Sequence, residues 1–369
     1  MKLRFVNIPL IQLTWRTLKG GKISARGALI LFVYYIKLIL AIPPAFMHFV
    51  VYAHRIKTTP ISLPPIFILG HYRSGTTYLQ KLMVSDKRFG FVTNYEGLFP
   101  YSNLFFGNWL QRLLQFLAYR LNIKNLFFND TITELADPLE DDQFLIFKAS
   151  AFSAYWGFVF PGKFSEWLNC SNNFRNDAYR VKWEKEYLAL LKTATFKNKG
   201  KQLVLKNPPN TERIKYLLEL FPDAKFIYIY RNPIDVFYSM RNVWHTAILK
   251  LYCLQKPAKQ QIDGLILEHM VYLADQYEKQ KKLIPPENLF EVKYEELEKD
   301  PFTIIEEIYS KLDLPDFGST SDDLLRKLKQ EKRYHKFKYF YDEDALRMAE
   351  QKLEKYIKQW SSKSTELIH

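Results

Sequence analysis

The chain has 369 residues, of which 48% are hydrophobic and 16% aromatic. This composition supports a substantial buried core in one large domain or two smaller ones, and it excludes a largely disordered protein. Its two cysteines, Cys170 and Cys253, are far apart in the chain, which excludes a disulfide framework or a Cys/His metal site and favours a reducing, cytoplasmic location.

The net charge of +14 is concentrated in residues 1–60, which contain no Asp or Glu and contribute +9 of it. The basic residues of this segment are Lys2, Arg4, Arg16, Lys19, Lys22, Arg26, Lys37, Arg55 and Lys57. They surround apolar stretches instead of forming a polar face, which favours an anionic membrane surface as partner over nucleic acid. Residues 1–60 are therefore interpreted as a membrane-associating segment, with the protein peripheral on the cytoplasmic, inner face of a membrane.

Two apolar runs, residues 27–42 and 45–53, lie within this segment. Neither reaches the about 20 residues that a spanning helix needs, and Pro43 and Pro44 would break a helix joining them. A cleaved signal peptide fits poorly, because the first run starts late and no small-residue cleavage site follows it. The pattern favours helices on or shallowly in the membrane surface. A hydrophobic helix packed on the domain and a true anchor are the alternatives.

Beyond residue 60, buried apolar strands alternate with helices. Strands are predicted at residues 65–69, 202–205, 225–230 and 288–292, and helices at 78–84, 212–220, 234–243, 262–282, 301–312, 320–330 and 343–360. This alternation predicts an α/β fold, with a P-loop-like parallel sheet flanked by helices, for a domain of residues 61–369. Residues 98–190 are aromatic-rich and mainly helical or irregular, and are interpreted as a cap insertion on the acceptor side.

A glycine-bounded turn follows the first strand. Gly70 and Gly75 are separated by four residues, and Thr76 and Thr77 follow. Such a turn offers backbone N–H groups and a helix N-terminus to an anion. The nucleoside-triphosphate version requires a lysine where Thr76 stands, and here the cation, Arg73, lies inside the loop. A shorter anionic chain such as phosphosulfate fits better, and an ordinary glycine turn is the alternative.

A second strand–turn–helix pattern begins at residue 225. Arg231 stands at the carboxyl end of the strand, where open α/β sheets bind ligands, and Ser239 follows eight residues later in the next helix. An arginine fork and a serine hydroxyl can converge on one phosphate. In the alternative, Arg231 pairs with a helix end and Ser239 only packs.

Together, RSGTT after one strand and RNPxDxxxS after a later one resemble the sulfotransferase family. Residues 292–301 resemble a third stretch of that family, YEDLxxxP, and the motifs span residues 64–340. The resemblance implies 3′-phosphoadenosine-5′-phosphosulfate (PAPS) as the sulfuryl donor. By this resemblance, its phosphosulfate is held by Arg73, Ser74, Gly75, Thr76 and Thr77, its 3′-phosphate by Arg231 and Ser239, and its adenine lies against Tyr78 and near Tyr294.

The sequence departs from the family in one respect. It lacks the RKGxxGxW loop with which soluble small-molecule members close over the 3′-phosphate. A basic stretch, residues 332–338, stands at about that position. Arg333 and Lys336 are its candidate donor contacts, and a solvated run of charge is the alternative.

Two cations are candidates for stabilising the leaving phosphate. Lys206 ends the strand at 202–205, where family members often have a lysine, and Arg73 lies in the first loop. In-line sulfuryl transfer needs alignment and charge stabilisation, and no metal is predicted. Many relatives place a histidine base shortly after this strand, whereas Asn207 and Asn210 stand here.

The base is therefore predicted to be a carboxylate of the acidic cluster at residues 137–142, with Glu140 first and Asp141 second. Burial of adjacent acids near cations raises one pKa toward neutrality. Related bacterial sulfotransferases carry a similar cluster. The alternatives are a capping cluster at a helix N-terminus, or His71 or His245 as the base.

The acceptor is predicted from the aromatic stretch at 98–160 and the basic apolar N-terminus. Most of these aromatics are expected in the core, and a fraction in an apolar acceptor pocket; they include Phe99, Tyr101, Phe105, Phe106, Trp109, Phe128, Tyr155, Trp156 and Phe158. A small lipophilic alcohol, such as a sterol, quinone or lipid, is favoured. A carbohydrate- or tyrosine-directed sulfotransferase, a P-loop kinase and a non-catalytic nucleotide-binding membrane protein are the alternatives.

Overall fold

The computed structural model describes residues 4–100, 102–123, 134–150, 152–168, 174, 176–330 and 342–366. By packing, the chain divides into two compact units. Unit 1 comprises residues 1–62, 91–200 and 243–258, and unit 2 comprises residues 63–90, 201–242 and 259–369. The N-terminal segment and the helical insertion therefore belong to one unit, and both phosphate-binding motifs belong to the other.

Unit 2 is built on a parallel sheet of five strands in the order β2-β3-β1-β4-β5. The strands are β1 (Ile66–Leu69), β2 (Phe89–Gly90), β3 (Gln202–Lys206), β4 (Lys225–Tyr230) and β5 (Leu289–Lys293). The predicted α/β fold with a parallel sheet is confirmed. Because the chain passes from β3 to β4 across β1, the strand order reverses between β1 and β4. Ligands of open α/β sheets bind at such a point, beside the carboxyl ends of the strands.

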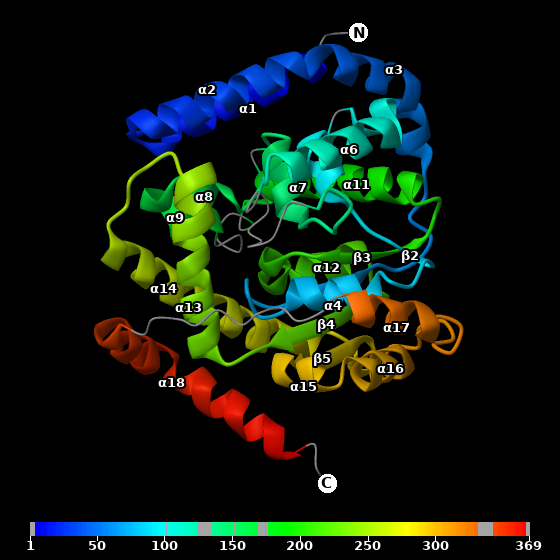
Figure 1. Cartoon of the computed structure of the whole chain (residues 1–369), viewed down its shortest axis with the longest axis vertical. Helices are drawn as coiled ribbons and strands as arrows, with labels where there is room; N and C mark the ends of the chain where they lie inside the picture. The colour runs from blue at the N-terminus through cyan, green and yellow to red at the C-terminus, as the bar shows by residue number, and fades with distance from the viewer. Residues whose placement is uncertain are drawn as a thin grey trace. The chain divides into compact units, whose positions relative to one another are not determined.

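Both faces of the sheet are covered, which explains why its central strands are continuous apolar runs. On one face, Ile66, Ile68 and Ile227 form a buried core with residues of helices α4 (Thr76–Met83), α15 (Tyr294–Lys299), α16 (Pro301–Lys311) and α17 (Ser321–Gln330). On the opposite face, the ring of Tyr228 stacks on the ring of Tyr277, with 3.5 Å between the centroids. The helices α12 (Ile214–Leu220) and α14 (Lys259–Gln280) belong to that side (Figure 1).

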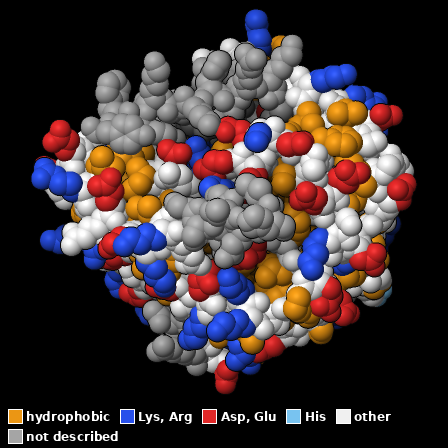
Figure 2. Space-filling model, turned by 90° about the horizontal axis from the view of Figure 1, so that it is seen from below, with side chains coloured by type: hydrophobic (Ala, Val, Ile, Leu, Met, Phe, Trp, Pro, Cys, Tyr) orange, Lys and Arg blue, Asp and Glu red, His pale blue; other side chains and the backbone are white. Residues whose placement is uncertain are grey.

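Two further helices, α13 and α18, belong to unit 2. Helix α13 (Pro233–Val243) follows β4 and continues into a π-helical segment, Trp244–Tyr252, with which the chain enters unit 1. Helix α18 (Glu343–Glu366) packs on α14, where the Tyr356 hydroxyl donates to Asp275 Oδ1 at 2.5 Å. Figure 2 shows one face of the molecule, on which basic and acidic side chains are intermixed.

Unit 1 is mainly helical, as predicted for residues 98–190. Its helices are α1 (Arg4–Gly20), α2 (Ala25–Leu40), α3 (Ile42–Thr58), α5 (Asn94–Leu98), α6 (Asn103–Arg120), α7 (Asp141–Phe147), α8 (Trp156–Val159), α9 (Phe164–Leu168) and α11 (Asp177–Lys197). The predicted break at Pro43 and Pro44 is confirmed, because these prolines lie in the first turn of α3 and the axes of α2 and α3 differ by 44°.

Helix α2 at its start and helix α3 at its end are hydrogen-bonded to other parts of unit 1. Ser24 caps α2 by accepting a hydrogen bond from Gly27 N, and Ser24 N donates to Leu254 O at 2.8 Å. At the end of α3, Lys192 Nζ donates to Lys57 O at 2.9 Å. Among the described residues, no single helix is long and apolar enough to cross a bilayer, and only the bent pair α2–α3 satisfies length and composition together.

Candidate active site

The first phosphate-binding motif forms a strained loop between β1 and α4. Gly70 has φ 139° and its N–H donates to Thr211 Oγ1 at 3.0 Å. Arg73 adopts a left-handed conformation, with φ 69°, which is uncommon outside glycine. Ser74 closes the turn, since its hydroxyl donates to His71 O at 2.8 Å. Gly75 has φ 102° and caps α4, so the loop ends at a helix N-terminus as predicted.

Gly75 allows close contact between this loop and α15. A Cβ atom at Gly75 would lie 2.3 Å from Cδ2 of Tyr294. We expect Gly75→Ala to lower the free energy of unfolding by about 1–3 kcal/mol, because it combines left-handed strain with a clash. Urea unfolding measures this. Gly264→Ala is the matched control, since nothing lies within 4 Å of a Cβ there, and it should be neutral or stabilising. Equal effects of the two substitutions would contradict the prediction.

The second motif begins where β4 ends. Arg231 is only 8% exposed, and its guanidinium carbon lies 4.6 Å from the ring centroid of Tyr294. Its Nη2 is 3.7 Å from Asp235 Oδ2. Asn232 Oδ1 accepts a hydrogen bond from Ile234 N at 2.9 Å and starts α13. The strand end, the arginine and the helix start therefore follow directly on one another, as the motif predicts.

A direct hydrogen bond joins the two motifs. Arg73 Nε donates to Ser239 Oγ at 2.9 Å, although the two residues are far apart in the sequence. Lys206 is the last residue of β3 and is 3% exposed; its neighbours in the sheet are the residues of β1, where Ile68 is its register partner. The carboxyl ends of β1, β3 and β4 thus carry Arg73, Lys206 and Arg231. This edge of the sheet has the chemistry of a site for a polyanion.

Comparison with known proteins identifies the family. Residues 64–318 match the sulfotransferase family. The chain belongs to this family, and it is a sulfotransferase. The resemblance inferred from the motifs is thereby confirmed. The sulfotransferase is 31% identical, over 271 residues, to the omega-hydroxy-beta-dihydromenaquinone-9 sulfotransferases Stf3 of Mycobacterium tuberculosis and Mycobacterium bovis, with 73% of this chain and 67% of each relative covered.

Solved structures agree with this fold. The sulfotransferase STF9 from Mycobacterium avium superimposes with a TM-score of 0.68 at 18% identity, over 94% of this chain and 95% of that one. The sulfotransferase STF1 from M. tuberculosis gives 0.68 at 17% identity, over 94% and 91% of the two chains. At these identities the likeness shows a shared sulfotransferase fold.

The remaining predicted donor contacts of the sulfotransferase lie in the first turn of α4 and beyond. Thr76 is buried, whereas Thr77 and Tyr78 are half-buried, and Tyr78 packs against the core of unit 2. Stacking of Tyr78 on adenine stays a prediction. Arg333 and Lys336, with the basic stretch around them, lie outside the described residues.

Sequence reasoning missed the support of the first loop. Thr211 accepts from Gly70 N, and it lies in a 3-10 turn, Pro208–Glu212, that is wholly buried. Asn207 Nδ2 donates to Asn210 Oδ1 at 3.0 Å in the same segment. From the sequence, the two asparagines indicate only that no histidine base follows this strand. Their position immediately after a strand end was the one signal that they could be part of the site.

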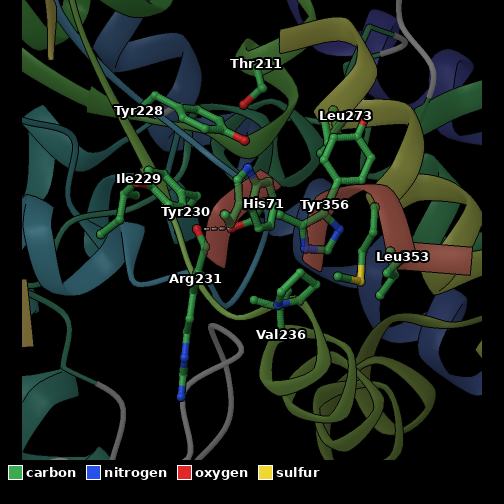
Figure 3. Close-up of a pocket in the computed structure, with 15 residues that line it drawn as sticks. His71, Thr211, Tyr228, Ile229, Tyr230, Arg231, Val236, Leu273, Leu353 and Tyr356 are labelled. Atoms are coloured by element: carbon green, nitrogen blue, oxygen red, sulfur yellow. Dashed lines mark hydrogen bonds between the residues drawn. The ribbon is translucent and has the colours of Figure 1, made fainter. Parts of the chain in front are cut away.

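His71 lines a cavity beneath the strand ends, together with Tyr228, Tyr230 and Tyr356 (Figure 3). Its Nδ1 is 2.8 Å from Tyr72 O, and loss of hydration lowers its pKa to about 4. The side chain of Arg231 extends away from this cavity (Figure 3). The environment of His71 is that of a packed neutral imidazole.

The acidic cluster lies in unit 1, and its three adjacent acids at the start of α7, Glu140, Asp141 and Asp142, have different surroundings. Asp141 Oδ2 accepts from the Tyr187 hydroxyl at 2.7 Å, and Asp142 Oδ1 accepts from Ala154 N at 2.6 Å, all within the buried interior. Glu140 is the N-cap residue of α7, but its side chain makes no capping hydrogen bond. Asp141 and Asp142 therefore support the fold of unit 1, as acids in a first helical turn do, whereas Glu140 has no capping role.

Proposed function

We propose that this sulfotransferase takes its sulfuryl group from PAPS and passes it to the hydroxyl of a lipophilic acceptor, with Glu140 as the base. The observation that carries the donor assignment is the hydrogen bond from Arg73 to Ser239, which brings a phosphosulfate motif and a 3′-phosphate motif together. The family membership sets aside the P-loop kinase and the non-catalytic nucleotide-binding protein.

The residues of unit 2 fit a donor with two separate anionic groups. Gly70 and Gly75 let the loop pack against β4 and α15, since a Cβ atom would lie 2.4 Å from Ile229 O at Gly70 and 2.3 Å from Tyr294 Cδ2 at Gly75. The loop with Arg73, together with Lys206, would hold the phosphosulfate, and Arg231 with Ser239 the 3′-phosphate. When bound, PAPS supplies the sulfuryl group and leaves as 3′-phosphoadenosine-5′-phosphate.

The chain's own groups would then perform two tasks. Glu140 accepts the proton of the acceptor hydroxyl as its oxygen forms a bond to sulfur. Lys206 and Arg73 stabilise the charge on the phosphate oxygen whose bond to sulfur breaks. One proton is transferred, one O–S bond forms and one S–O bond breaks, so the reaction needs no oxidant or reductant.

The acceptor class is supported by kinship and by composition. The Stf3 relatives are named as sulfotransferases of a hydroxylated dihydromenaquinone. Residues 1–60 of this chain combine nine basic residues with long apolar runs. Both observations favour a hydroxyl on an apolar, quinone-like molecule over a sugar or a tyrosine.

Transfer from ³⁵S-labelled PAPS tests this function. Full-length protein in detergent would be offered hydroxylated menaquinone analogues, a sterol, a long-chain alcohol, a sugar and a tyrosine peptide. Label in the quinone or another lipophilic product is the expected result. If label appeared only in the sugar or the peptide, the acceptor would be a carbohydrate or a tyrosine and not a lipophilic alcohol. If the protein did not bind PAPS, the donor assignment would be refuted.

We expect Glu140→Gln and Asp141→Asn to fail in different ways. Loss of a general base lowers kcat about 10²–10⁴-fold, so Glu140→Gln should lose turnover while it keeps its Tm and donor affinity. Asp141→Asn should instead lower the free energy of unfolding by about 1–3 kcal/mol, because it disturbs the buried bond from Tyr187. The turnover number and the Tm of both variants are measured. Tyr187→Phe is the control, because it removes the same hydrogen bond to Asp141 without changing a carboxylate.

A fully active Glu140→Gln protein would contradict this assignment. If Asp141→Asn and not Glu140→Gln lost turnover at unchanged Tm, the base would be Asp141, the second of the two predicted residues.

A further inference from the structure

Helix α6 of unit 1 exposes a stripe of large apolar side chains. Trp109 is 61% exposed and Phe116 is 59% exposed, and Phe105 and Leu113 are exposed on the same helix. Trp109, Leu113 and Phe116 are separated by four and three residues, so they lie along one face of the part of α6 that follows a kink at Gly107, whereas Phe105 precedes the kink. The expectation that the aromatics of this region lie in the core or a pocket is confirmed for Tyr155, Trp156 and Phe158, which are buried, and is wrong for Phe105 and Trp109. Tyr101 and Phe128 lie outside the described residues.

Two neighbouring helices expose similar stripes. On α2 the exposed residues are Leu29, Phe32, Val33, Ile36, Ile39 and Leu40, and on α3 they are Phe46, Met47, Val50 and Val51. Within unit 1, α3 packs against both α2 and α6, and the Tyr52 hydroxyl of α3 donates to Leu104 O of α6 at 3.4 Å (Figure 1). The exposed stripes of α2, α3 and α6 are named the docking face. Exposed apolar residues gathered on neighbouring helices are typical of an interaction site.

The charged residues carried by the docking-face helices and by α1 have one sign. The sequences of α1, α2, α3 and α6 contain no Asp or Glu. Their exposed cations, with those of the turn between α1 and α2, are Lys19, Lys22, Arg26, Arg55, Lys57, Arg112 and Arg120. The face in Figure 2, by contrast, mixes both signs. Apolar helices whose own charged residues are all basic complement a surface that is apolar inside and anionic at its boundary. One acid lies next to them, since Glu134 accepts a hydrogen bond from the Tyr119 hydroxyl of α6.

We propose that the docking face binds the surface of an anionic lipid bilayer, with α2, α3 and α6 lying along it. Contacts within unit 1 favour this arrangement over a crossing of the bilayer. Helix α2 is held at its start by Gly27 against Leu254, and α3 at its end by Lys192 on Lys57 O. One side of each helix is thus occupied by protein, and the other presents its apolar residues outward.

The docking face also connects to the acidic cluster. The hydroxyl of Tyr34 on α2 donates to Ile146 O, in the last turn of α7, at 2.6 Å. Lys37 Nζ lies 4.9 Å from the ring centroid of Phe147, the last residue of α7. Glu140 stands at the N-cap position, at the other end of this helix, and its side chain makes no capping hydrogen bond. The helix that begins at the proposed base is therefore attached directly to a helix of the docking face. A lipophilic acceptor would reach it from the bilayer, a consequence that rests on the proposed function.

Vesicle co-sedimentation of the full chain tests the docking face without donor or acceptor. Vesicles of phosphatidylcholine, with or without phosphatidylglycerol, are the probe. We expect binding to the anionic vesicles, and a loss of affinity of at least about tenfold for Trp109→Ser/Phe116→Ser and for Phe32→Ser/Val33→Ser. The matched control is Leu283→Ser/Leu325→Ser, two exposed leucines of unit 2, which should bind like the wild type. Circular dichroism and Tm confirm that each variant is folded.

Three outcomes would overturn the proposal. Equal binding to neutral and anionic vesicles, or binding that the docking-face variants do not weaken, would remove the lipid assignment. Resistance of the wild type to extraction by alkaline carbonate would mean that α2–α3 crosses the bilayer. A lipid-free dimer that the same variants dissociate, without vesicle binding, would mean that a second copy covers the face. Because vesicle binding needs no PAPS, failure of sulfuryl transfer would refute the proposed function alone.

Discussion

Replacing Lys206 with alanine should lower kcat about 10²–10³-fold, while the affinity for the donor changes much less. The physical reason is that a preorganised cation is most valuable where charge develops, and the leaving phosphate gains charge only as the S–O bond breaks. Lys206 is suited to this task because it is buried at the end of β3, next to the strand that leads into the phosphate loop. Single-turnover transfer from PAPS separates the chemical step from binding.

The control is Lys201→Ala, which removes an exposed lysine immediately before the same strand and should leave kcat unchanged. Lys206→Arg keeps the charge but changes its geometry, and should recover part of the activity. If Lys206→Ala raised the donor Kd and left kcat intact, Lys206 would bind the ground state and would not stabilise the leaving group.

Replacing Arg231 with alanine should weaken binding of 3′-phosphoadenosine-5′-phosphate about 10–100-fold. Hydrogen bonds to charged groups contribute about 1.5–3 kcal/mol to the free energy of binding. The substitution also removes the stacking of the guanidinium on Tyr294. Isothermal titration calorimetry with this product measures the effect without chemistry. Adenosine-5′-phosphosulfate, which lacks the 3′-phosphate, sharpens the test: the wild type should prefer the ligand with the 3′-phosphate, and Arg231→Ala should lose that preference.

Ser239→Ala should shift the same preference in the same direction but less, because it removes one neutral donor. Lys215→Ala, at an exposed lysine of α12, serves as the control for a lost positive charge. Equal weakening of both ligands by Arg231→Ala would show that Arg231 does not recognise the 3′-phosphate.

The sheet of this protein was predictable because its strands are short, continuous apolar runs bounded by turn residues. Strands β1, β3, β4 and β5 appear within one residue or so of their predicted bounds. The edge strand β2 was missed, since two residues, Phe89 and Gly90, show no periodicity. The sequence also predicted two motifs at the carboxyl ends of neighbouring parallel strands, with Ser239 paired with Arg231 on one phosphate. In the structure it is Arg73, of the first motif, whose Nε donates a hydrogen bond to Ser239 Oγ.

Other features depend on contacts that no local pattern encodes. Thr211 supports Gly70 from a segment 141 residues away. The partners of Asp141 and Asp142 likewise come from distant or irregular segments, so the sequence could not separate these acids from Glu140. Aromatic content could not distinguish a buried Trp156 from an exposed Trp109, because that difference depends on which helices cover each residue.

The fit of α2 against residues 250–254 has a practical consequence for handling the protein. Gly27 lies so close that a Cβ would be 2.2 Å from Leu254 O, and Ser24 bonds to the same carbonyl. Removing residues 1–58 would therefore take these partners away from Leu254 and would uncover the side of α7 on which Lys37 lies over the Phe147 ring. The shortened protein would lose one exposed apolar surface and gain another. Detergent or lipid nanodiscs with the full chain are therefore the better route to a homogeneous sample.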